Sequence, residues 1–492
     1  MGWLLRPMGA LLGLIASKDR SSSQSRDPPL LKLGADFLTL HQLYEGVLAI
    51  GGTGSGKTSS LAHLMLALME QGVGMLILTA KGTDYADVAR LARMAGREMD
   101  LRRFAPGERW KFDFLNYELN RRRGGSVESG SQLFSDLVDV ASRTQSSDSR
   151  DPFWTLAANR LIRMAMYLCW WTFDECSVSD LYVFISSLAT SPDAMKTAEW
   201  SDGFAAKCRA AAWNTAGWMD DTDLHLAMQY CYDQFPRMGE KTSAGIVATA
   251  LNAVSKFVHG DVQKLVADGS TNLSPDDVLA GRIVVIDMPA LMYREPGQFV
   301  QLVWKLSTIR ATLRRDLSAN ARPVCLWADE AQLHAIPSVD SMTQAVARSH
   351  RLINVAITQN LPLLYATLKS REDAISWVSN LQTKLIFSNS DAETNVYFSS
   401  LFGQSKQCLM NTSMDTTQPY SIVDDLFGIM PKASVTMSEN WFPDVRPEEF
   451  TRLRKGGNDN RKLVDCFVFQ GGRRFSGNGN RTWTKVTFKQ MG

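Results

Sequence analysis

Residues 51–58, GGTGSGKT, carry the spacing G-x-x-x-x-G-K-[ST]. Glycines in such a run let the backbone take positive φ and bring its N–H groups close to an anion. The apolar run 47–50 leads in and the helix-like stretch 59–70 leads out, which is the strand–loop–helix setting that the motif requires. A glycine-rich turn with a stray lysine would need neither flank. We therefore interpret the run as a phosphate-binding loop.

The residue types in this loop predict ATP and Mg²⁺ as cofactors. Lys57 would reach the β- and γ-phosphates, and Thr58 would ligate Mg²⁺. The N-terminus of the following helix would face the same anion. Nine consecutive residues form the predicted binding loop: Gly51, Gly52, Thr53, Gly54, Ser55, Gly56, Lys57, Thr58 and Ser59.

A pair of carboxylates, Asp329 and Glu330, follows the apolar run 324–328. A buried strand would deliver Asp329 beside the loop, where it can hold Mg²⁺ through water. Glu330 is the candidate to orient and deprotonate an attacking water. An Asp-Glu pair at a strand end can also be an ordinary helix cap. With a phosphate loop upstream, we favour the catalytic interpretation.

Two further polar features surround the next apolar run, 353–358. If that strand lies beside the phosphate-loop strand in a parallel sheet, the amide of Gln359 reaches the γ-phosphate as a sensor. Arg348 and Arg351 precede the strand, and either one could act as a finger on the nucleotide of a neighbouring subunit. The alternative for both arginines is a solvated basic helix end.

The elements that must position these residues alternate between strand and helix. Apolar strand-like runs recur at 75–80, 282–290, 322–332, 353–360 and 383–391, and two more close the chain around Gly471-Gly472. Helical patterns follow several of them, so a mainly parallel α/β sheet is expected. The stretch 109–118 is strand-like and residues 120–132 suggest a polar loop. From 177 to 275 the pattern is helical and rich in Trp, Met and Ala, which predicts an inserted all-α domain.

Composition bounds the class of protein. The chain has 492 residues, which is too long for one ordinary core, so more than one domain is expected. A content of 45% hydrophobic and 21% charged residues is typical of a globular protein. The net charge is only +2, so any basic surface must be local. Seven scattered cysteines, none in C-x-x-C, fit a reduced compartment, and six histidines form no zinc ligand set.

Two local charge clusters suggest where DNA could lie. From Thr451 onward ten basic residues stand against two acidic ones. Arg473 and Arg474 follow the predicted Gly-Gly turn, where their side chains would be free and exposed, and a second cluster covers residues 121–123. These residues are either a surface that tracks DNA phosphates without reading sequence or a solvated edge that blocks strand pairing.

The N-terminus contains an apolar segment, residues 3–16, that is shorter than the roughly 20 residues a spanning helix needs. Its apolar side chains share one helical face. An interfacial membrane helix, a partner-docking helix and a loosely ordered terminus all fit the pattern. A signal peptide does not suit an ATP-binding chain whose first residues carry one arginine. Residues 17–29 form a polar linker.

The order of motifs resembles the TraG/TraD family of coupling proteins from conjugative type IV secretion. The similarity runs from about residue 45 to 490 and includes GGTGSGKTSS, CLWADEAQ, ARSHRLINVAITQN and RPEEFTRLRKGG. It implies a RecA-like P-loop NTPase domain (45–176 and 276–492), an inserted all-α domain (177–275) and an N-terminal segment (1–44). It also implies a hexameric ring that hydrolyses ATP and pumps DNA towards a secretion channel, at the cytoplasmic face of the inner membrane.

The same resemblance assigns roles to individual residues and shows two departures. By this resemblance Lys57 binds phosphate, Asp329 holds the metal and Glu330 activates water. Arg348 stands at the position of the family's arginine finger, and Gln359 stands at the position of its γ-phosphate sensor. The family places an Asp two residues before the Lys-Gly of its second strand, where this chain has Thr79. The family also carries an N-terminal transmembrane hairpin, whereas only the short segment 3–16 precedes the motor here.

Three functions are consistent with these features. The first is a DNA-pumping coupling protein that links a relaxase–DNA complex (relaxosome) or a protein substrate to the secretion channel. The second is a double-strand DNA translocase of the FtsK/HerA kind. The third is a nucleotide-dependent docking protein that transports nothing. The predicted all-α insertion and the ending EEF..LR.GG favour the first.

Overall fold

The computed structural model describes residues 27–121, 125–143, 152–214, 219, 221–414 and 433–491. A nine-stranded sheet has the order β13-β12-β9-β3-β8-β7-β4-β6-β5. The strands from β9 to β5 run parallel, and β12 and β13 extend the sheet antiparallel. The predicted mainly parallel α/β fold is therefore confirmed. The strands are β3 (Val47–Ile50), β4 (Gly74–Leu78), β5 (Leu101–Phe104), β6 (Ile283–Ile286), β7 (Val324–Ala328), β8 (Leu352–Thr358), β9 (Thr383–Ile386), β12 (Leu463–Gln470) and β13 (Trp483–Lys489).

Helices cover both faces of the sheet because the central strands are buried on both sides. On one face, α2 and α3 pack against alternate residues such as Val47, Met75 and Trp327. On the other face, α16, α17 and α18 pack against residues such as Leu48 and Ile50, and α14 packs nearby. These helices are α2 (Lys57–Glu70), α3 (Asp84–Met94), α14 (Ala290–Arg314), α15 (Pro337–Ala347), α16 (Leu361–Leu368), α17 (Arg371–Asn380), α18 (Ala392–Phe402) and α20 (Pro447–Thr451).

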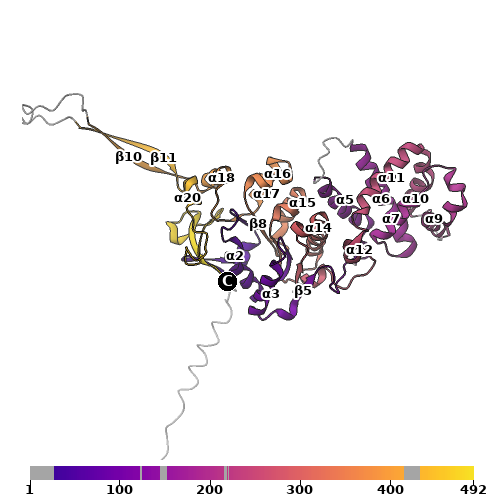
Figure 1. Cartoon of the computed structure of the whole chain (residues 1–492), viewed down its shortest axis with the longest axis horizontal. Helices are drawn as coiled ribbons and strands as arrows, with labels where there is room; N and C mark the ends of the chain where they lie inside the picture. Colours follow the sequence, from indigo (N-terminus) through magenta and orange to yellow (C-terminus); the bar gives the residue numbers. More distant parts are fainter. Residues whose placement is uncertain are drawn as a thin grey trace, which may run out of the picture.

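The stretch predicted to be helical contains helices and no named strand among its described residues. It gathers at one end of the molecule (Figure 1). Its side chains form one continuous hydrophobic cluster with α14 and with sheet residues such as Leu76 and Val284. The boundaries at 176 and 276 stay a prediction. The helices within 177–275 are α7 (Val178–Ser186), α8 (Ala198–Asp202), α9 (Phe204–Asn214), α10 (Thr222–Gln229), α11 (Glu240–Ser255) and α12 (Gly260–Val266), and α13 (Pro275–Leu279) begins at the end of the stretch. Two earlier helices, α5 (Val127–Arg143) and α6 (Pro152–Phe173), belong to the same hydrophobic cluster.

The predicted strand at 109–118 is wrong. Phe112 makes only an isolated bridge to Thr271, and the next residues form helix α4 (Phe114–Leu119). Asp113 begins this helix as its N-cap, since its side chain accepts a hydrogen bond from the backbone N–H of Asn116 at 3.1 Å. Burial raises the pKa of Asp113 to about 7. The predicted polar loop at 120–132 is also partly wrong, because α5 begins at Val127.

Two hairpins lie outside the central sheet, and the sequence patterns did not single them out. The first pairs β1 (Pro29–Leu33) with β2 (Asp36–Thr39), and the second pairs β10 (Gln404–Met414) with β11 (Ala433–Pro443). The β10–β11 hairpin projects from the body, on the side away from the helical end (Figure 1). Met410, Met437 and Trp441 are exposed on it.

The apolar N-terminal segment, residues 3–16, lies outside the described residues, as do Arg122 and Arg123 of the second basic cluster. Within the described part of the chain, a search for a helix with the length and apolarity of a membrane span finds none.

A buried ion-pair network joins α4, α5 and α14. The carboxylate of Glu118 is fully buried and accepts from Arg314 Nη1 at 2.8 Å and from Ser129 Oγ at 3.1 Å. One turn away, Arg310 donates to Asp136 at 3.1 Å. Removing one partner of a buried pair leaves an uncompensated charge, so this network fixes α14 against the helical end of the molecule.

We expect Glu118→Ala to lower the free energy of unfolding by about 2 to 3 kcal/mol, because it leaves the Arg314 guanidinium without its carboxylate in a largely buried site. Thermal unfolding of the purified protein measures the change. Glu98→Ala is the matched control, since Glu98 pairs with Arg93 at 2.9 Å on the surface. Equal shifts of the melting temperature in both variants would contradict the structural role of the buried network.

Candidate nucleotide site

The loop 51–58 joins β3 to α2, and its glycines are required by geometry. Gly54 and Gly56 have φ values of 71° and 83°, which favour glycine. A Cβ on Gly51 would lie 2.7 Å from Phe387 Cβ, and one on Gly56 would lie 2.5 Å from Val464 Cγ2. The loop therefore keeps its backbone exposed to an anion only because it carries no side chains at these positions.

Lys57 begins α2 and folds back over its own loop. Its Nζ donates to the carbonyl oxygens of Gly51 and, at 3.0 Å, Gly52. Burial lowers the pKa of Lys57, while Glu330 and Asp329 act in the opposite direction. The hydroxyl of Ser55 is buried in the same loop with no hydrogen-bond partner. An ammonium group bonded to loop carbonyls and a buried hydroxyl without a partner fit a phosphate group.

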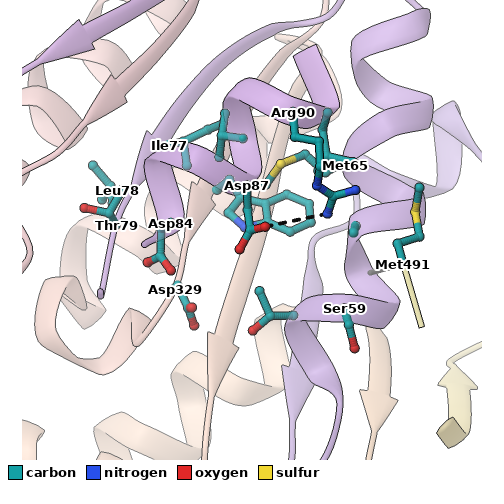
Figure 2. A pocket seen from close by; sticks show the side chains of 15 residues that line it. Ser59, Met65, Ile77, Leu78, Thr79, Asp84, Asp87, Arg90, Asp329 and Met491 are labelled. Carbon is teal, nitrogen blue, oxygen red and sulfur yellow. Dashed lines mark ion pairs between the residues drawn. The ribbon is translucent and has the colours of Figure 1, made fainter. Parts of the chain in front are cut away.

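Asp329 lies at the carboxyl end of β7, beside Asp84 at the start of α3 (Figure 2). Burial raises the pKa of Asp329 to about 6, and repulsion from Asp84 and Glu330 adds to the shift. Thr58 is exposed and lines the same cavity, which has a volume of about 200 Å³. Concentrated negative charge next to a free hydroxyl fits a divalent cation.

The described residues contain no preformed group of three His, Cys, Asp or Glu side chains able to hold a metal. A cation at Thr58 and Asp329 would therefore need further oxygens from a nucleotide or from water. Behind these polar groups the cavity is apolar, lined by Met65, Ile77, Val88, Leu91 and Trp327.

Glu330 has both carboxylate oxygens held by amides. Gln359 Nε2 donates to Oε1 at 2.8 Å, and Gln332 Nε2 donates to Oε2 at 2.7 Å. Its backbone is left-handed, with φ 48° and ψ 50°, which costs a non-glycine residue about 1 kcal/mol or more. The backbone N–H donates to Asp329 Oδ1 at 3.0 Å. The side chain is thus fixed next to the phosphate loop by several contacts.

Gln359 follows β8, and the structure confirms the strand order that its predicted role required. β8 pairs with β3 in parallel, with Thr358 opposite Ile50. The carbonyl of the Gln359 side chain accepts from Thr53 Oγ1 at 3.2 Å, which links β8 to the phosphate loop. Two sequence-predicted residues, Gln359 and Glu330, therefore meet directly at the edge of the sheet.

The two arginines before β8 lie elsewhere. Arg348 ends α15, is 62% exposed, and its Nη1 lies 3.9 Å from Glu45 Oε1. Arg351 donates to the carbonyl of Ala321 at 2.8 Å. In the described part of this chain no hydrogen bond or ion pair joins either guanidinium to the phosphate loop. Arg348 points outward, as a residue that acts on another subunit would have to.

Sequence reasoning assigned no role to Asp84 or Gln332. Asp84 Oδ2 accepts from the backbone N–H groups of Ala80 and Lys81, both at 2.8 Å, which turns the carboxylate towards Asp329. Its only sequence signal was its place at the start of a predicted helix. Thr79, at the position of the family's acid, is buried and donates to Ile286 O at 2.9 Å. It therefore ties β4 to β6.

The hydroxyl of Ser59 has partners within the chain. It donates to Gly56 O at 3.1 Å and accepts from Gln490 Nε2 at 3.1 Å. Its role in binding a nucleotide remains a prediction. Ser59 also lines the 200 Å³ cavity, as does Met491.

Helix α14 holds the segment after β7 from behind. Gln298 Nε2 donates to Leu333 O at 2.6 Å, and Lys305 Nζ donates to His334 O at 2.7 Å. Lys305 also pairs with Asp340 at 2.6 Å. His334 is buried, and burial followed by the charge of Lys305 lowers its pKa to about 3. This histidine is therefore neutral and belongs to the packing of the loop, as expected for an incidental residue.

The expectation that Arg473 is a free, exposed side chain is wrong. Its guanidinium donates to Gln42 Oε1 at 2.9 Å and to Phe37 O at 2.7 Å, and it stacks over Phe475. Arg473 therefore fastens the β1–β2 hairpin to the C-terminal strands. Six other basic residues of the C-terminal segment are exposed and have no ion pair in the described structure: Arg452, Lys455, Arg461, Lys462, Arg474 and Lys489.

Comparison with known proteins gives two kinds of match. Residues 323–439 match the family described as "TraM recognition site of TraD and TraG". This segment contains β7, Asp329, Glu330, β8, Gln359, β10 and the first part of β11. Among curated proteins no sequence matches.

Solved structures share the fold over nearly the whole chain. The unbound bacterial conjugative coupling protein TrwBdeltaN70 has a TM-score of 0.61 at 15% identity, with 94% of this chain and 90% of that chain covered. Plasmid coupling protein TrwB with the ATP analogue ADPNP has a TM-score of 0.60 at 15% identity, and TrwB with ADP and Mg²⁺ has 0.61 at 14%, with the same coverage. The matched segment and this fold confirm the resemblance to TraG/TraD coupling proteins that was read from the sequence.

Proposed function

We propose that this chain is an ATP-hydrolysing coupling protein of a conjugative type IV secretion system. It links DNA, carried in a relaxosome, or a protein substrate to the secretion channel, and it pumps DNA. The observation that carries the proposal is the Glu330 carboxylate, held at one sheet edge with Lys57 and Asp329 beside a phosphate-sized loop. The match of residues 323–439 to a TraM recognition site supports a relaxosome partner.

The residues divide the hydrolysis between them. Lys57 exchanges the carbonyls of Gly51 and Gly52 for the β- and γ-phosphates, and the loop N–H groups enclose them. Thr58 and Asp329 hold Mg²⁺, whose charge would offset that of the phosphates. Glu330 orients a water molecule and takes its proton. TrwB, which has this fold, binds ADPNP, and it also binds ADP with Mg²⁺.

Subunit assembly follows from the same proposal. A hexameric ring would bring the exposed guanidinium of Arg348 to the nucleotide of the next subunit, where it would stabilise charge in the transition state. DNA would be held through its phosphates, without sequence preference. The protein would work in the cytoplasm at the inner membrane, with residues 3–16 as a membrane or partner contact.

The chemistry predicts different effects for two substitutions. Lys57→Ala should abolish ATP turnover because it removes the phosphate contact, and Glu330→Gln should keep ATP binding but stop hydrolysis because the water loses its base. A phosphate-release assay and a binding assay with ADPNP measure the two steps. Hydrolysis by Glu330→Gln at the parent rate would refute the assignment of the base.

The ring predicts sharing of sites between subunits. Arg348→Ala should bind ATP normally and turn it over on the order of 10³-fold more slowly. Mixing Arg348→Ala with Lys57→Ala subunits should restore part of the activity, because some interfaces then contain one intact site. Native mass spectrometry confirms the mixing. An absence of rescue in mixed assemblies would speak against a finger acting in trans.

The exposed basic residues predict the salt dependence of DNA binding. Replacing Arg461 and Lys462 with Gln should flatten the slope of log K against log[salt] by about one to two, since each lost phosphate contact releases about one fewer counterion. The change should be similar for unrelated DNA sequences. Arg473→Gln is the control, because that side chain is bonded within the chain and should affect stability instead. An unaltered slope in the double variant would assign Arg461 and Lys462 to a solvated edge.

An ATPase rate that DNA does not change in the parent protein would favour a docking protein that transports nothing.

A further inference from the structure

Gln332 is a buried glutamine directly behind the proposed base. Its side chain is 4% exposed. Its Nε2 donates to Glu330 Oε2 at 2.7 Å, and its Oε1 accepts from Thr358 Oγ1 at 2.9 Å. Both ends of the amide are thus fixed, which also fixes its orientation. Thr358 is the last residue of β8 and is almost fully buried, so this contact is anchored in the core of the sheet.

A second amide holds the other oxygen of the same carboxylate, with a different anchor. Gln359 Nε2 donates to Glu330 Oε1 at 2.8 Å, and Gln359 Oε1 accepts from Thr53 Oγ1 at 3.2 Å. Thr53 is exposed and belongs to the phosphate loop. Two hydrogen-bonded arms therefore hold Glu330, Thr358–Gln332 and Thr53–Gln359, and each consists of a hydroxyl followed by an amide. The first arm ends in a strand of the sheet, and the second ends in the loop that would receive the nucleotide.

We propose that Gln332 is a positioning residue for Glu330, and that the Thr53–Gln359 arm is the one that responds to nucleotide. This inference rests on the proposed function. When phosphates occupy the loop, Thr53 and Gln359 gain new partners and Oε1 of Glu330 becomes free to accept the proton of a water. Gln332 keeps Oε2 in place throughout, so the carboxylate stays aimed at the loop.

The backbone of Glu330 makes such a fixed arm necessary. The residue sits in the left-handed region, at the point where β7 ends and the short helix Ala331–His334 begins. In the described structure Gln332 is the partner of Oε2, and Gln359 is the partner of Oε1. Loss of Gln332 would leave the Glu330 carboxylate, in the described structure, with only the hydrogen bond from Gln359, whose other end is bonded to the phosphate loop.

The first test is the steady-state kinetics of Gln332→Leu, which keeps the size of the side chain and removes the amide. We expect kcat to fall by about 10- to 100-fold, because a base displaced by a fraction of an ångström transfers its proton poorly. We expect KM for ATP and the affinity for ADPNP to stay within about twofold, because Gln332 does not touch the phosphate loop. An unchanged kcat, or a loss of ADPNP affinity as large as the loss of kcat, would overturn the inference.

The second test is a double-mutant cycle with Thr358→Val. If Thr358 acts by orienting Gln332, Thr358→Val should lower kcat on its own and have no further effect in Gln332→Leu. Thr358→Ser, which keeps the hydroxyl, should restore the rate. Thr383→Val is the matched control, since the Thr383 hydroxyl is buried without a hydrogen-bond partner on β9, which β3 separates from β8. Additive losses, or equal losses in Thr358→Val and Thr383→Val, would overturn the inference. If Gln332→Leu does not fold, the comparison of Thr358→Val with Thr358→Ser and Thr383→Val decides the case.

The failure of this inference can be told apart from failure of the proposed function. Hydrolysis by Glu330→Gln at the parent rate would remove the base itself, and with it both proposals. An inactive Glu330→Gln together with a fully active Gln332→Leu would overturn the positioning role and leave the proposed base intact.

Discussion

The hydrogen bond from Gln359 to Glu330 joins the ends of β8 and β7 at 2.8 Å, and the rest of the site depends on the constraint that makes it possible. Because β3, β8 and β7 are parallel neighbours, their carboxyl ends meet at one edge of the sheet. That edge receives the phosphate loop from β3, an amide from β8 and two carboxylates from β7. A single change in strand order would separate them, whatever their sequence motifs.

The same edge concentrates charge in a way that prepares it for ligands. Asp84, Asp329 and Glu330 lie close enough for their repulsion to add to the raised pKa of Asp329. Lys57 lies opposite, with a pKa lowered by burial and its ammonium bonded to its own loop. Burial disfavours the charged forms of both Asp329 and Lys57, and their present partners in the protein do not fully offset that cost. A polyanion with a divalent cation would improve both, which is the physical basis for proposing ATP and Mg²⁺.

Sequence reasoning succeeded where local pattern decides the structure. Short buried strands such as 47–50 and 324–328 are uniformly apolar and end in polar motifs, so their type and the residues at their ends could be predicted. It failed at 109–118, because the alternating apolar residues Phe112 and Phe114 suggested a strand. The capping role of Asp113 decides for a helix there.

Contacts between distant residues were also missed. Arg473 bonds to Gln42 and to Phe37 O, more than 400 positions earlier in the chain, and no local pattern announces such a partner. Gln332 was overlooked for the same reason, since its role depends on Thr358, which lies 26 positions later. The position of Asp84 beside Asp329 depends on the pairing of β4 with β7, which the sequence does not show.

Helix α14 has a mechanical consequence. It grips the segment after β7 through Gln298 and Lys305, and it grips α4 and α5 through Arg314 and Arg310. From Gln298 to Arg314 the helix is about 24 Å long, and a helix resists compression and stretching along its axis. A displacement of the segment after β7 would therefore reach the helical end of the molecule as a rigid-body movement. In this sense α14 is a rigid mechanical link between the candidate nucleotide site and the helical end of the molecule.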